Sequence, residues 1–199
     1  MFDLTSSKLK IGGLFLCLAA VSGNALADDV KNSIEEAMEY YQEGAYKDAV
    51  ESLNYASQLI QQMKGKKLEE FLPKIEGWSA TKAESKSIGA SMLGGGITVE
   101  GYYRKDTSSV SVQMITDSPM MQTMIMMISN PMIATADGGQ LQRIGREKAI
   151  VKYDEDKQSG EIRMVVADSY LITIEGKKVT EETLIEFAEA IDFKKLKDL

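Results

Sequence analysis

The chain has 199 residues, of which 44% are hydrophobic and 27% are charged, a balance typical of a globular protein. Its 23 basic and 30 acidic residues give a net charge of −7. An acidic chain without a basic block lacks the positive surface that nucleic acid requires, so a nucleic-acid partner is excluded. The chain contains no histidine, and its single cysteine is Cys17.

Residues 1–27 have the pattern of a cleaved secretory signal peptide. An apolar run over residues 11–21 is followed by Ala25 and Ala27, the small residues that signal peptidase requires. This run is too short to cross a bilayer, which takes about 20 apolar residues. The sequence therefore predicts export, and we expect a periplasmic mature chain without a transmembrane segment, cysteine or histidine. Lipid modification of Cys17 is the minor alternative.

Residues 28–72 are predicted to form two helices that pair as a hairpin. Gly44 is expected to end the first helix, and Gly65 is expected to end the second. Apolar residues recur at helical spacing, which predicts one apolar stripe on each helix. The stripe residues are Ile34, Ala37, Met38 and Tyr41 on the first helix and Ala49, Val50, Leu53, Ala56 and Ile60 on the second.

The junction between these helices carries a specific pattern. Residues 40–49 read Tyr-Tyr-Gln-Glu-Gly-Ala-Tyr-Lys-Asp-Ala, which resembles the YY-x-x-G-x-Y-x-x-A signature of the tetratricopeptide repeat. Tyr40 and Tyr41 are therefore candidate binding residues. Repeat arrays need about three units to bury a continuous core, so a single hairpin must pack against the rest of the chain or another subunit. A plain antiparallel helix pair is the alternative interpretation.

Residues 73–199 are predicted to form an α+β domain, with a mainly antiparallel sheet and its helices on one face. The expected elements are hairpins over residues 97–115 and 149–166, a strand over 170–174, and helices over 120–129 and 184–190. This order of elements resembles the small domains of the PsbP and Mog1 type. The resemblance implies a binding or assembly factor, because those families consist mostly of such proteins.

The absence of histidine and of a mature cysteine excludes hydrolase triads, cysteine nucleophiles and the usual zinc sites. Paired carboxylates can still hydrolyse glycosides, and Asp154, Asp156 and Glu161 are the candidates. They cluster at a predicted hairpin tip that has no apolar enclosure to raise a carboxyl pKa. A solvated turn is the favoured interpretation of this cluster.

Methionine is concentrated in one segment, since seven of the twelve methionines lie between Met114 and Met132. The candidate binding residues on the predicted helix are Met120, Met121, Met124 and Met127. Three interpretations remain open: core packing, a contact surface for a partner or lipid, and a Cu(I) site that includes Met121 and Met124.

The sequence thus favours a secreted, non-catalytic binding or adaptor protein that engages a protein partner or an apolar ligand. A Cu(I)-binding protein that uses methionine thioethers is the first alternative, and a carboxylate-dependent hydrolase is the second. No cofactor is expected under the favoured interpretation, and the oligomeric state is left open.

Overall fold

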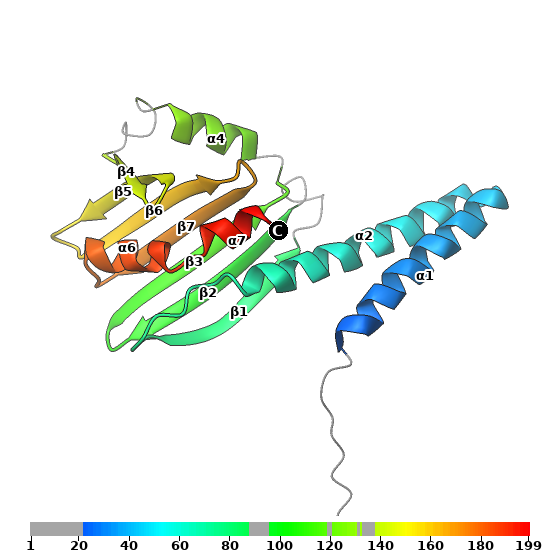
Figure 1. Cartoon of the computed structure of the whole chain (residues 1–199), viewed down its shortest axis with the longest axis horizontal. Coiled ribbons are helices and arrows are strands. Elements are labelled where there is room, and N and C mark those ends of the chain that lie inside the picture. The colour runs from blue at the N-terminus through cyan, green and yellow to red at the C-terminus, as the bar shows by residue number, and fades with distance from the viewer. Residues whose placement is uncertain (1–21, 88–95, 119–120, 131, 133–137) are drawn as a thin grey trace, which may run out of the picture.

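The computed structural model describes residues 22–87, 96–118, 121–130, 132 and 138–199. The helices are α1 (Ser22–Gln42), α2 (Tyr46–Glu69), α4 (Met121–Ser129), α6 (Glu181–Glu189) and α7 (Phe193–Lys197). The strands are β1 (Ser79–Ser87), β2 (Ile97–Lys105), β3 (Ser108–Thr116), β4 (Gln140–Ile144), β5 (Glu147–Asp154), β6 (Ser159–Val166) and β7 (Tyr170–Lys177). The predicted α+β class is confirmed (Figure 1).

Within the described residues, seven strands form one antiparallel sheet in the order β1-β2-β3-β7-β6-β5-β4. Neighbouring strands in the sequence pair as hairpins, whereas β3 and β7 join the two halves of the sheet over a long stretch of chain. The edge strands β1 and β4 are additional to the strands expected from sequence. Both are largely polar, so their sequences lack the alternation that marks a half-buried strand.

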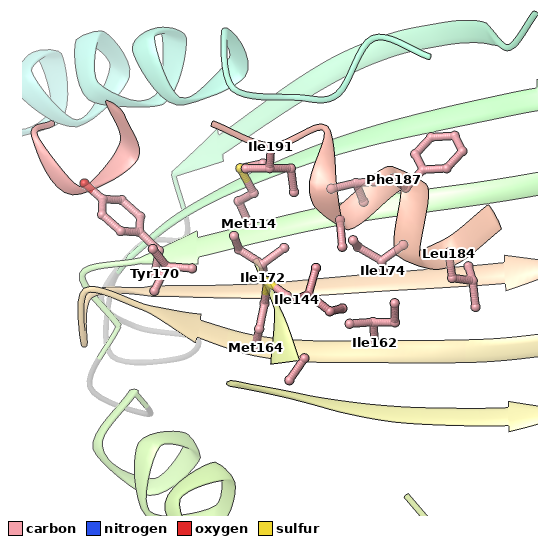
Figure 2. Packing of buried hydrophobic residues seen from close by; sticks show 14 of the residues in the cluster. Met114, Ile144, Ile162, Met164, Tyr170, Ile172, Ile174, Leu184, Phe187 and Ile191 are labelled. Carbon is pink, nitrogen blue, oxygen red and sulfur yellow. The ribbon is translucent and has the colours of Figure 1, made fainter. Parts of the chain in front are cut away.

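One face of the sheet, here called the inner face, carries the main core. Alternate side chains of the central strands, such as Met114, Met164 and Ile172, are completely buried there. Helix α6 covers them with Leu184 and Phe187, as Figure 2 shows. Thr180 caps α6, because its hydroxyl accepts a hydrogen bond from the Thr183 backbone N–H.

Helix α4 contacts the opposite, outer face of the sheet, so the helices do not all lie on the expected single face. Ile115, Ile150, Val165 and Leu171 alternate along their strands with the core residues and therefore point outward. Together they form an apolar area at one end of the outer face, and α4 covers it. Figures 1 and 2 show α4 across the sheet from α6.

Helices α1 and α2 form the expected hairpin, although both are longer than predicted. Helix α1 begins at Ser22 and therefore includes the last residues of the predicted signal peptide, whose residues 1–21 lie outside the described chain. Helix α2 continues through Gly65 to Glu69. Its last turn places Leu68, which is completely buried, in the core of the sheet. The hairpin is thus attached to the sheet at this end and extends away from it at the other (Figure 1).

Small side chains make the contact between α1 and α2. Ser33 and Ala37 on α1 and Ala49, Ser52 and Ala56 on α2 are all buried. These residues recur at the three- and four-residue spacing that places side chains on one helix face. Because none of these five is large, the two helices can approach closely along this stretch, and the larger Leu59 follows three residues after Ala56 as the next buried residue of α2.

We expect Ala49→Leu to lower the free energy of unfolding by about 1–3 kcal/mol, because the larger side chain overpacks this contact. Chemical denaturation of the purified chain measures the effect. Asn54→Leu, an exposed position on the same helix, is the matched control and should change stability by less than about 0.5 kcal/mol. Equal stabilities of the two variants would contradict the proposed packing.

Candidate functional site

The helical hairpin exposes a row of large apolar side chains along one side, here called the hairpin apolar face. Its members are Ile34, Met38 and Tyr41 on α1 and Tyr46, Val50, Leu53 and Ile60 on α2. Each is exposed by about two fifths to two thirds of its surface, and Tyr41 is the most exposed at 67%. Single exposed apolar residues are ordinary, but a contiguous row marks an interaction surface.

The exposed apolar residues of α1 and those of α2 lie on the same side of the hairpin. Within each helix the members recur at intervals of three, four or seven residues, which aligns them along one stripe. The rings of Tyr41 and Tyr46 meet at the turn, with their centroids 5.8 Å apart. This contact joins the stripe of α1 to the stripe of α2.

The described remainder of the chain leaves this face uncovered. Among the described elements only α2 makes extensive contact with α1, and α2 meets β1 and β2 through its C-terminal part. Leu68 enters the sheet core there, and Lys64 forms an ion pair of 2.6 Å with Asp117. Figure 1 shows the part of the hairpin that carries the apolar face extending beyond the sheet.

Two ion pairs of neighbouring residues lie on the surface of the hairpin. Lys31 lies 3.5 Å from Glu35 on α1, and Lys47 lies 4.0 Å from Glu51 on α2. At 100° per residue, the Lys31–Glu35 pair falls on the outer edge of the α1 stripe, whereas Glu51 lies on the side of α2 that carries Tyr55. Such exposed pairs contribute little to stability, but the Lys31–Glu35 pair leaves the outer edge of the α1 stripe without net charge.

The opposite side of the hairpin is acidic. Glu36 accepts hydrogen bonds from the hydroxyls of Ser52, at 3.2 Å, and Tyr40, at 3.3 Å. The negative charge of Glu36, followed by smaller effects of Asp48 and Glu43, raises the pKa of the Tyr40 phenol. The two predicted binding tyrosines therefore separate: Tyr41 lies on the apolar face, and Tyr40 is half-buried beside the acidic side.

The predicted stripes contained every member of the apolar face except Tyr46, together with the alanines. The structure divides each stripe into an inward row, which is small apart from the added Leu59, and an exposed row of large residues. The signal was present in the spacing of Ser33, Ala37, Ala49, Ser52 and Ala56, which is helical in its own right. Since the closest helix contacts require small residues, these rows, rather than the large residues, face the neighbouring helix.

The methionine helix α4 combines a buried side with an exposed one. Met121, Ile125 and Ile128 pack against the apolar area of the outer sheet face. Met126, by contrast, is 70% exposed, and Met127 is about one-third exposed. The other two predicted binding residues give no test, because Met120 and the side chain of Met124 lie outside the described residues.

The arrangement gives no support to Cu(I) binding at Met121 and Met124. The Met121 side chain, which is only 7% exposed, packs against the sheet and is therefore not free to face a solvent-borne metal ion. Within the described residues, no group of three or more Asp, Glu, His or Cys side chains is arranged to hold a metal. The described helices also include none with the length and apolar character needed to cross a membrane.

The carboxylates at the tip of the β5–β6 hairpin lie in ordinary surface pairs. Asp154 accepts hydrogen bonds from the side chain and the backbone N–H of Lys157, and this partner lowers the Asp154 pKa. Glu161 accepts a hydrogen bond of 2.7 Å from Arg163, and Asp156 is exposed. A general acid needs a raised pKa in an apolar enclosure, so this cluster has the properties of the solvated turn that the sequence favoured.

The outer sheet face also contains a shallow hollow of about 490 Å³, next to β2, β3 and β7. Most of the residues that line it are of polar type, and they include Tyr102, Arg104, Ser111, Glu175 and Lys177. An antiparallel sheet often exposes one polar face to water, and these side chains fit that pattern.

We expect Met121→Ala to lower the free energy of unfolding by about 2–5 kcal/mol, because it leaves a cavity between α4 and the sheet. Met126→Ala is the matched control on the same helix and should change stability by less than about 0.5 kcal/mol. Thermal or chemical denaturation distinguishes the two. A Met121→Ala variant with the stability of the wild type would show that α4 does not pack against the sheet.

Comparison of the chain with models of known protein families and with curated proteins finds no match in either set. In the described structure, the hairpin apolar face is the feature that ordinary folding requirements leave unexplained.

Proposed function

We propose that the protein is a non-catalytic binding or adaptor protein of the bacterial periplasm, and that it engages a protein partner through the hairpin apolar face. The observation that supports this proposal is the contrast between the two sides of each helix. Small residues are buried between the helices, whereas large apolar residues such as Tyr41 and Leu53 are exposed. A chain that needed these residues only for its own stability would bury them.

The shape of the face favours a protein over a small apolar ligand. Small-molecule sites are usually concave and enclose most of the ligand. The hairpin apolar face instead runs along the length of two helices, and none of its members lines any of four hollows that lie at the sheet and its C-terminal helices. Extended helical surfaces of this kind bind the apolar side of another helix or helix pair.

We expect the double variant Ile34→Ser, Leu53→Ser to lose its complexes in the envelope, because it removes apolar area from the centre of the face. Chemical cross-linking in intact cells, followed by purification of the tagged chain, measures complex formation. Both positions are exposed, so the melting temperature should stay close to that of the wild type.

Tyr55→Ser is the matched control, because Tyr55 is 52% exposed, as is Leu53, but lies on the other side of α2. This control should keep every complex that the wild type forms. Loss of complexes in both variants, or in neither, would contradict the role of the hairpin apolar face.

The proposed location rests on the signal peptide pattern of residues 1–27. Intact-mass measurement of the protein from the envelope fraction should show a chain that begins at Asp28, because cleavage follows Ala27. A chain that keeps Cys17 and carries an added lipid would overturn both the cleavage site and the unanchored periplasmic state.

A further inference from the structure

We infer that the partner of the hairpin apolar face is a second copy of this chain, and that two hairpins pack face to face as a four-helix bundle. The inference rests on the proposed function and specifies the partner. Two helical hairpins with matching apolar sides make a standard bundle, in which the apolar residues of all four helices form one core. A two-fold arrangement would place the same surface of each copy in the interface.

The distribution of charge permits this pairing. The acidic residues Glu36, Glu43 and Asp48, whose charges all act on Tyr40, lie on the side opposite the apolar face. In a face-to-face dimer they would point away from the second copy, so the two acidic sides would not oppose each other. The outer edge of the α1 stripe, which would meet the second copy, carries the Lys31–Glu35 pair, and this pair has no net charge.

The apolar area matches what a stable dimer needs. Complete burial of one aromatic side chain removes about 150–250 Å² from water, so seven large side chains that are about half exposed offer roughly 500 Å² per copy. A standard stable interface buries about 800 Å² on each partner, of which non-polar atoms supply a little over half, or about 450 Å². The hairpin apolar face thus supplies the apolar part of one such interface.

The single hairpin gives an independent reason to expect a second copy. A repeat-like helix pair cannot bury its exposed side alone, and in repeat arrays the next unit covers it. The described chain contains one such pair, and the sheet receives only the last turns of α2. A second copy would supply the missing unit without another gene product.

Light scattering during size-exclusion chromatography of the processed, purified chain tests the inference. The wild type should elute at twice the mass of one chain and dissociate on dilution. Leu53→Glu should elute as a folded monomer with wild-type circular dichroism, because it places a charge in the apolar contact. Tyr55→Glu, the matched control on the other side of α2, should remain a dimer. A monomeric wild type at every concentration, or a dimeric Leu53→Glu variant, would overturn the inference.

Photo-cross-linking identifies the partner directly. The residues Tyr41 and Tyr55 are each replaced by p-benzoylphenylalanine, which keeps the aromatic ring at two exposed positions. Cross-linking from position 41, but not from position 55, should join two copies of the chain, as mass spectrometry of the product shows. A product with a different protein in the envelope would overturn the second-copy inference and leave the proposed function standing. The absence of any protein product from position 41 would overturn both.

Discussion

The close approach of α1 and α2 determines what the rest of the hairpin presents to its surroundings. A helix has a limited circumference, so residues that face the neighbouring helix cannot also face solvent. Because Ala37, Ala49 and Ala56 occupy the buried side, the large apolar residues lie about a quarter turn away on both helices. The exposed apolar side is thus a direct consequence of an interface made from small residues. Its extent and its position away from the sheet are the properties on which the proposed function depends.

The C-terminal end of α2 attaches the hairpin, and with it the apolar face, to the sheet. Helix α2 runs without interruption from the exposed region into the sheet core, where Leu68 is completely buried. The ion pair between Lys64 and Asp117 adds a second link at the same place. Since a helix is stiff along its axis, the apolar face is held at a distance from the α+β domain. Among the described residues, this leaves the whole apolar face clear of the sheet.

The two faces of the sheet explain the composition of α4. Most outward-facing positions are polar, such as Gln113, Thr173 and Glu175, and these can remain in water. At one end of the outer face, however, Leu171 and its neighbours are apolar and need a cover. Helix α4 provides it with one side, and methionine suits such a contact because its flexible side chain adapts to an irregular surface. The contact with the sheet therefore accounts for the buried side of α4 and not for the exposed Met126.

Local patterns in the sequence predicted most of the helices and strands. The hairpins of β2–β3 and β5–β6 and the helix at Met121–Ser129 follow from periodicity or capping, which act over a few residues. The polar edge strands β1 and β4 did not follow, because pairing with a neighbour stabilises them rather than their own pattern. Only the tertiary structure decided that α4 lies on the outer face, and that Leu53 faces solvent while Ala56 is buried. The physical reason is that burial depends on which surfaces meet in space, and periodicity defines an apolar stripe without saying what will cover it.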